Sequence, residues 1–419
     1  MKDISLTVGV VAFLLSVGGC YPPSDRCANP VKPESGQVFE LPGFGTITTL
    51  GSLGGSGRYP AEPVASAYAV NAAGMVVGSA WDRCDRNPRA FLWQDGTIRD
   101  LGTLGGSQSS ATDINDLGQV VGESTTGKIT RIIPVILYVY LQEEHLAFLW
   151  ENGQITRLVT PPGAIESGAT GINANGQIVG YAGFDWSTLE TQNGEPTSKR
   201  RGRSTSIIGP ASRAMLWELV DGAWQVTPLA EVADGQSSAA DINARGQIVG
   251  WATTLPTYEV HASVWEAGTL TDLGTLGGTW SEAAAINDAG QIVGWASPPE
   301  DLDAAVGPYL LPEHAVLWEQ LDGAWQIVDL GILDGGRSEA HDINSAGQVV
   351  GWFNLDESNA RHALLWQDGA MTDLNTLLPA DSGWELLEAS AINDAGQITA
   401  TARRTGDDLE LAVLIELAP

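Results

Sequence analysis

The sequence predicts an all-β protein, a seven-bladed β-propeller of four-stranded blades that is closed by an N-terminal strand completing the last blade. Three observations lead to this fold class. One phrase, Ala-x-x-Ile-Asn or a close variant, recurs seven times along the chain. Each copy is followed by short β-prone runs and turn residues. Finally, one repeat is divided between the two ends of the chain.

Each copy of the phrase ends on an asparagine, and a glycine follows three residues later, a pattern typical of a tight hairpin turn. A second phrase, Ala-x-x-Trp, follows six of the copies, and a third, Asp-Leu-Gly-Thr-Leu-Gly-Gly, is clearest at residues 100–106 and 272–278. We interpret these runs as four short strands, a to d, in each repeat. The asparagines lie 44 to 70 residues apart, a spacing that fits propeller blades and exceeds that of leucine-rich repeats. They are Asn71, Asn115, Asn173, Asn243, Asn287, Asn344 and Asn393.

The two ends of the chain predict a closed ring. After Asn393 the sequence supplies strands a, b and c of the last repeat and then reaches Pro419. A run that resembles the missing strand d stands near the other end, at Gly45–Gly55. Propellers remove free sheet edges by completing the last blade in this way, whereas an open solenoid has no reason to divide a repeat.

The amino-acid composition limits the classes of partner that this protein is expected to bind. The chain of 419 residues has a formal net charge of −30 and contains 50 glycines. Regular apolar runs between glycine-rich turns argue against disorder. A field of this sign repels phosphate backbones and anionic surfaces, so we expect no nucleic-acid partner.

The first residues have the pattern of an export signal. Lys2 precedes an apolar run from Ile4 to Val17, which is too short for a comfortable membrane span. The residues 17–20, Val-Gly-Gly-Cys, resemble the bacterial lipobox, in which the cysteine is lipidated. We therefore expect a signal peptide at 1–19, a lipidated Cys20 with a Pro-rich tether at 20–42, and the propeller at 43–419. The resemblance implies a membrane anchor, with the outer membrane favoured by Tyr21; the alternative is a plain secreted protein.

Two further cysteines, Cys27 and Cys84, are each preceded by Asp-Arg. Export makes a disulfide chemically possible, and it would join the tether to a loop of the first repeat. Two free thiols are the alternative.

The repeat phrases resemble the bacterial extracellular HAF repeat family. Residues 361–366, Arg-His-Ala-Leu-Leu-Trp, and residues 145–150, His-Leu-Ala-Phe-Leu-Trp, carry this resemblance together with the Asp-Leu-Gly-Thr-Leu-Gly-Gly phrase. The resemblance implies an exported repeat protein, and it implies no particular activity.

No motif indicates catalysis or metal binding. Four of the five histidines stand at or beside one repeated place before strand c, which favours a structural role over a catalytic one. Asp113, Asp241 and Asp342 open Asp-Ile-Asn phrases that faintly resemble a calcium loop, but the other copies have Ala or Gly there. We therefore interpret these phrases as hairpins and expect no catalytic residue, no metal and no cofactor.

Two features point to one face of the ring as a binding surface. Trp251, Trp295 and Trp352 end strand b in three consecutive repeats, and Trp280 and Trp384 lie in d–a connections. The large insertions, at 127–144, 183–212 and 298–313, all fall in b–c connections, which emerge on the same face. Indoles suit sugars or apolar partners, although inter-blade packing is the alternative. The apolar run 131–141 in the first insertion predicts an extra hairpin or a contact patch.

These observations support three hypotheses about function. The first is a non-enzymatic, surface-exposed lipoprotein of the cell envelope, monomeric, that binds a glycan or an envelope protein through the b–c/d–a face. The second is an extracellular enzyme acting on polysaccharides, a lyase or hydrolase, with acids at the top of the central channel. The third is a purely structural envelope protein.

Overall fold

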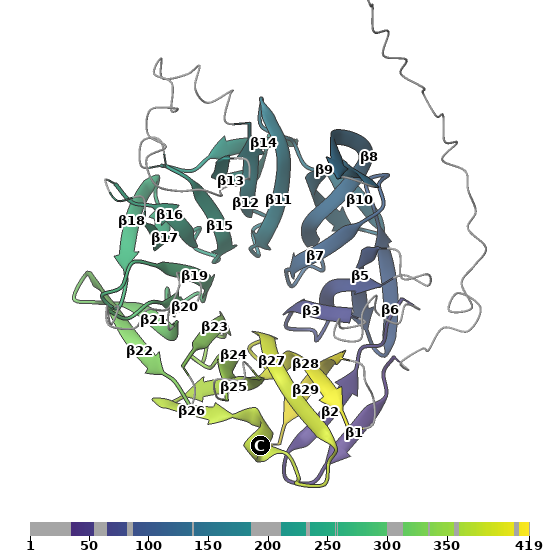
Figure 1. Ribbon diagram of the computed structural model, residues 1–419, viewed down its shortest axis with the longest axis vertical. Helices are drawn as coiled ribbons and strands as arrows, with labels where there is room; N and C mark the ends of the chain where they lie inside the picture. Colours follow the sequence, from purple (N-terminus) through teal and green to yellow (C-terminus); the bar gives the residue numbers. More distant parts are fainter. Residues whose placement is uncertain are drawn as a thin grey trace, which may run out of the picture.

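Seven antiparallel sheets stand around a common axis, each with its strand a innermost (Figure 1). The computed structural model describes residues 35–53, 65–81, 87–135, 138–185, 211–231, 235–255, 257, 259–299, 313–333, 336–355, 360–405 and 410–418, with the backbone alone for 131–135 and 138–142. The predicted seven-bladed propeller is therefore confirmed. Among these residues, no helix has the length and apolarity that crossing a membrane requires.

Blades 1 to 6 each use four consecutive strands. Blade 1 comprises β3 to β6 (Ala65–Val70, Val76–Trp81, Pro88–Gln94, Thr97–Gly102), and blade 2 comprises β7 to β10 (Ser109–Ile114, Val120–Val135, Tyr138–Glu151, Gln154–Arg157). Blade 3 comprises β11 to β14 (Ala164–Ile172, Ile178–Phe184, Ala211–Val220, Ala223–Pro228). Blade 4 comprises β15 to β18 (Ser237–Ile242, Ile248–Thr253, Val260–Glu266, Thr269–Gly274). Blade 5 comprises β19 to β22 (Ser281–Ile286, Ile292–Ala296, His314–Leu321, Ala324–Gly331). Blade 6 comprises β23 to β26 (Ser338–Ile343, Val349–Asn354, Arg361–Gln367, Ala370–Asp373) and is followed by the short 3-10 helix η2 (Leu374–Leu377).

Blade 7 joins the two ends of the chain. Its strands a to c are β27 (Trp384–Ile392), β28 (Gln397–Arg404) and β29 (Glu410–Leu417), and its strand d is β2 (Gly45–Thr49). The register runs from Gly45 opposite Leu417 to Thr49 opposite Val413. The segment Val38–Leu41, which the sequence analysis assigns to the tether, forms β1 and adds a fifth strand outside β2.

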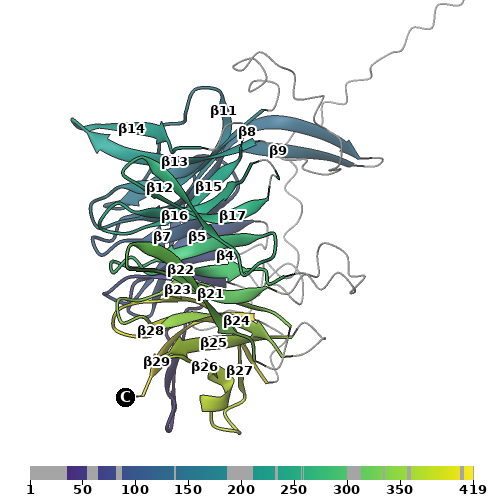
Figure 2. The same ribbon diagram turned by 90° about the vertical axis from the view of Figure 1, so that its left-hand side faces the viewer.

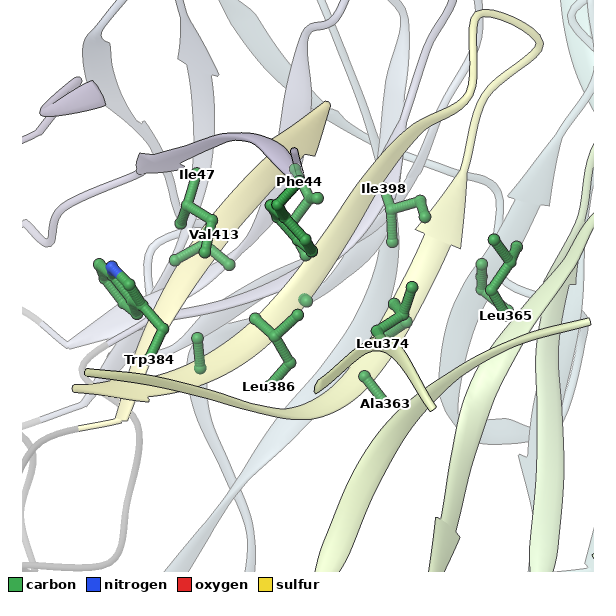
Figure 3. Close-up of a cluster of buried hydrophobic side chains, with 14 of the residues drawn as sticks. Phe44, Ile47, Ala363, Leu365, Leu374, Trp384, Leu386, Ile398 and Val413 are labelled. Atoms are coloured by element: carbon green, nitrogen blue, oxygen red, sulfur yellow. The ribbon is translucent and has the colours of Figure 1, made fainter. Parts of the chain in front are cut away.

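Side chains from both ends of the chain share one core between blades 6 and 7 (Figure 3). Phe44 and Ile47 are buried against Val413, Leu386 and the rest of this cluster. The described residues form seven such clusters, each built from two neighbouring blades. The apolar core therefore lies between blades, and closing the ring buries the last of the seven interfaces.

The repeat asparagines connect the blades at the a–b turns. Within its own turn, the Oδ1 of Asn243 accepts backbone N–H bonds from Arg245 (3.1 Å) and Gln247 (3.0 Å). Its Nδ2 donates to the carbonyl of Asn287 in the next blade (3.2 Å). The same bond recurs at all seven interfaces, at 2.9–3.2 Å, and the bond from Asn393 to Asn71 completes the circle. The repeat asparagine thus stabilises its own a–b turn and also bonds that turn to the next blade.

The first b–c insertion extends blade 2 as a two-stranded hairpin, as predicted for the apolar run 131–141. The register of β8 and β9 continues outward to Val135 opposite Tyr138. Figure 2 shows this hairpin projecting beyond the body of the ring on one side. Most of the other two insertions, at 186–210 and 300–312, lies outside the described residues.

Candidate functional site

One level of the ring carries a different pair of side chains in every blade. There a residue of strand a lies opposite a residue of strand b in each blade, and we call these seven pairs the cross-strand tier. In chain order they are Ser66/Ser79, Ser110/Glu123, Gly168/Tyr181, Ser238/Trp251, Glu282/Trp295, Glu339/Trp352 and Glu388/Thr401. The tier lies toward the b–c and d–a connections, on the face that the sequence analysis singled out.

The predicted indoles occupy different environments. Trp251 and Trp295 are half-buried in the tier, whereas Trp352 is only 1% exposed and lies beneath the guanidinium of Arg361, 3.9 Å from its ring centre. Trp384 is also buried, edge-on to Phe39 at 5.2 Å. Trp280 is 42% exposed. A ligand role for the five indoles stays a prediction.

A pocket opens in the tier at blade 7, where the strand b side chain is smaller than in blades 4 to 6. It has a volume of about 620 Å³ and spans blades 6, 7 and 1; we call it the blade 7 pocket. Thr401 lines it and stands in blade 7 where blades 4 to 6 have tryptophan. Because a threonine fills much less space than an indole, we attribute the pocket to this exchange. Its volume lies in the range of small-molecule sites.

Charged groups from several strands face the blade 7 pocket. They are His341, Arg361, Glu385, Glu388, Arg403 and Glu410. Arg361 Nη1 lies 3.0 Å from Glu388 Oε2, between blades 6 and 7. Arg403 Nη1 lies 3.3 Å from Glu385 Oε2, and its Nη2 lies 2.7 Å from Glu410 Oε1. Each arginine is therefore held by carboxylates while its side chain remains nearly half exposed, at 49% for Arg361 and 45% for Arg403.

His341 lies between two carboxylates of the same region. Its Nε2 is 3.7 Å from Glu339 Oε2, and its Nδ1 is 3.6 Å from Glu388 Oε1 and 3.2 Å from the carbonyl of Ala389. Burial alone would lower the pKa of His341, but the neighbouring carboxylates of Glu339 and Glu388 outweigh it and raise the pKa above its ordinary value of 6.5. The proton-bearing imidazolium is thus the form this environment favours.

Tyr68 of blade 1 supplies the aromatic surface of the pocket. Its side chain lines the pocket and the residue is 43% exposed. Its hydroxyl lies 3.2 Å from the hydroxyl of Ser79, its neighbour in the tier of blade 1. Ser66, Ser390 and Thr401 add hydroxyl-bearing side chains to the lining. The site can therefore offer hydrogen-bond donors, acceptors and one aromatic ring.

Three of the five histidines, all on strand c, pair with an aspartate of their own blade. The Nδ1 of His261 lies 2.9 Å from Asp272, that of His314 lies 2.8 Å from Asp329, and that of His362 lies 2.8 Å from Asp373. Each pair joins strand c to strand d or its end. Blades 1 and 3 have an arginine in place of this histidine, and it pairs as Arg89–Asp100 and Arg213–Glu231. These contacts link strands inside a blade. His362 also approaches the blade 7 pocket, since its Nε2 lies 4.0 Å from Glu385 Oε1, but the histidine that lines the pocket is His341.

Three aspartates lie on the innermost strands of alternate blades. Asp113 accepts backbone N–H bonds from Ile114 (2.7 Å) and from Ile172 of the next blade (2.7 Å). Asp241 and Asp342 make the same two kinds of bond. Burial, with the charge of Asp241 added, raises the pKa of Asp113 to about 7. Within the described part of the chain, no group of three or more His, Cys, Asp or Glu is arranged to hold a metal ion.

Several predicted residues cannot be placed. Cys20, Cys27 and Cys84, with the signal peptide and most of the tether, lie outside the described residues. Lipidation and the disulfide therefore stay predictions. Sequence reasoning did not find the blade 7 pocket; its one signal was the change from tryptophan in blades 4 to 6 to Thr401 in blade 7.

The comparisons with known proteins show what this chain resembles, and they assign no function to it. A family described as protein of unknown function (DUF3466) matches residues 281–414, which run from the start of blade 5 into β29. The match supports no assignment to HAF repeats. No curated protein matches the chain in sequence.

Solved structures resemble the chain weakly. TolB from Acinetobacter baumannii is 10% identical, with 79% of this chain and 60% of TolB covered and a TM-score of 0.34. XC5397 from Xanthomonas campestris, described as a gluconolactonase, is 13% identical, with 90% and 91% covered and a TM-score of 0.34. Trypanosoma rangeli sialidase is 10% identical, with 77% and 56% covered and a TM-score of 0.37. The chain thus spans less than two thirds of TolB and of the sialidase, and none of these similarities bears on function.

Proposed function

We propose that this protein is an exported, lipid-anchored envelope protein whose propeller binds a glycan in the blade 7 pocket. The observation that supports binding is the pocket itself, with hydroxyls, paired charges and the exposed ring of Tyr68 on its walls. Sugars are bound by flat aromatic faces together with convergent hydrogen-bonding groups. Export and anchoring rest on the N-terminal pattern that ends at Cys20.

Filling the pocket tests the proposal. Tryptophan is already accommodated at the equivalent place in blade 6, as Trp352, so Thr401→Trp is a substitution that the fold tolerates elsewhere. We expect the purified full chain to bind a subset of a glycan array and Thr401→Trp to weaken that binding at least about tenfold. Leu117→Trp is the control, because Leu117 is 73% exposed on an a–b turn at the opposite face.

A further variant separates the pocket from the predicted indole surface. Trp295→Thr removes one indole of the tier two blades away from blade 7. Loss of binding in Trp295→Thr with full binding in Thr401→Trp would move the site to the indoles and refute the pocket assignment. An array on which no glycan binds would refute glycan binding altogether.

One observation favours a second candidate, a polysaccharide-acting enzyme. Glu385 and Glu388 reach the pocket from the same strand, and glycoside cleavage uses a pair of carboxyl groups. Incubation of the protein with polysaccharides decides between the two: new reducing or unsaturated ends, lost in Glu385→Gln or Glu388→Gln, would identify an enzyme. Binding without product supports the glycan-binding module.

A further inference from the structure

The cations of the blade 7 pocket are each matched by a carboxylate. Glu388 holds Arg361, and Glu385 and Glu410 hold Arg403, at separations of 2.7–3.3 Å. These are the two arginines of the lining. An anionic ligand that entered would meet guanidinium groups whose charge is already matched by these carboxylates.

His341 is the third cation, and its surroundings are acidic as well. Its Nδ1 donates to the carbonyl of Ala389 and therefore carries a proton. Its Nε2 faces the Glu339 carboxylate at 3.7 Å, an arrangement that a lone pair on that nitrogen would make repulsive. With both nitrogens protonated, the lining has three cations, Arg361, Arg403 and His341, against three carboxylates, Glu385, Glu388 and Glu410.

We propose that the blade 7 pocket selects uncharged saccharides and rejects their acidic counterparts. This inference rests on the proposed glycan-binding function and specifies its ligand class. Sugar hydroxyls can accept from the remaining guanidinium N–H groups and donate to the carboxylates without disturbing the charge balance. The carboxylate of a uronic acid would lose its hydration without gaining an unmatched cation, and burying an uncompensated charge is costly. In addition, the protein's net charge of −30 repels polyanionic ligands as they approach.

Matched ligands test the charge selectivity. Neutral hexasaccharides, among them cellohexaose, maltohexaose, mannohexaose and xylohexaose, identify the preferred backbone by calorimetry with the full chain. The best neutral hexose oligomer is then compared with its C6-oxidised form, which has the same linkage and a carboxylate on each ring. We expect the oxidised form to bind at least about tenfold more weakly.

Removing one negative charge from the pocket should weaken its preference for the neutral ligand. Glu388→Gln keeps the shape of the side chain and leaves Arg361 without its carboxylate partner, so the lining gains one net positive charge. We expect the disadvantage of the oxidised ligand to shrink at least about tenfold, and added salt to reduce that change. Glu410→Gln makes the same charge change at Arg403, which keeps Glu385, and serves if Glu388→Gln unfolds.

Two outcomes would overturn the inference. One is an oxidised ligand that binds as tightly as its neutral counterpart, and the other is a discrimination that neither glutamine variant alters. If Thr401→Trp abolished equal binding of both ligands, the glycan-binding pocket would stand and its charge selectivity alone would be wrong. If no saccharide bound at all, the proposed function and the inference would both be refuted.

Discussion

At the scale of single residues, the c–d hairpins show how backbone conformation governs residue choice. Two-residue turns of this kind need positive φ at both central positions, which Asn, Asp and Gly accept more readily than other residues. Five of the first positions are Asp or Asn: Asp95, Asn152, Asp221, Asp322 and Asp368. Blade 4 has Ala267 there instead, at φ 48°, and Gly268 follows at φ 78°.

Ala267 is therefore a place where stability can be gained. We expect Ala267→Asn to raise the free energy of unfolding by about 1 kcal/mol, because asparagine tolerates the left-handed conformation. The reverse change at the equivalent residue of blade 5, Asp322→Ala, should lower it by a similar amount. Urea denaturation of both variants checks the pair; changes of the same sign in the two would contradict the explanation.

At the scale of elements, the a–b turns connect neighbouring blades, and their asparagines are buried. Asn243 is 3% exposed and makes bonds to its own turn, to Gln247 and to the next blade. We expect Asn243→Ala to cost about 2–3 kcal/mol, since buried partners are left unsatisfied. Asn175→Ala is the control: its side chain donates one exposed bond to Ala244, at 2.9 Å, so its loss should cost less than about 1 kcal/mol. Equal losses in thermal or urea denaturation would show that the blade-to-blade bond contributes little.

The sequence predicted these elements well because their determinants are local. An asparagine, two residues and a glycine define a turn wherever they recur, and seven copies of one phrase define seven strands a. The blade 7 pocket depends instead on residues that lie far apart in the chain, such as Tyr68 and Arg403, and on the size of one side chain, Thr401. The repeat pattern reports what the blades share, whereas the pocket depends on a tier position whose residue varies from blade to blade.

At the scale of the whole molecule, closing the ring brings together carboxyl groups that no single blade contains. Asp113, Asp241 and Asp342 come from blades 2, 4 and 6, yet the charge of Asp241 contributes to the raised pKa of both others. Burial is the largest cause at each of the three and raises the pKa of Asp113 and of Asp342 to about 7. The odd-numbered blades have Ala69, Gly171, Ala285 and Ala391 at this place, so each aspartate has a small residue beyond it in the next blade.

These aspartates should make the ring more stable in mild acid. Their pKa in the folded protein is higher than the ordinary value of 3.8, so the folded state binds more protons than the unfolded state between about pH 4 and pH 7. Stability from these groups therefore rises as the pH falls through that window, and the raised pKa of His341 acts in the same direction nearer neutrality. We expect the free energy of unfolding to be roughly 2 kcal/mol or more higher at pH 5 than at pH 8.

The triple variant Asp113→Ala, Asp241→Ala, Asp342→Ala separates these groups from the general effect of net charge. Alanine already occupies the equivalent position in blades 1, 5 and 7, so the exchange introduces no side chain that the ring does not accommodate. Removing three carboxyls among 51 acidic residues hardly changes the overall repulsion, but it removes the groups that titrate near the axis. Urea denaturation at the two pH values should show a clearly smaller pH difference in the triple variant than in the parent protein. Parallel pH profiles would assign the acid stabilisation to the surface charge instead, and would mean that the three aspartates stay ionised across the window, held by their backbone N–H bonds.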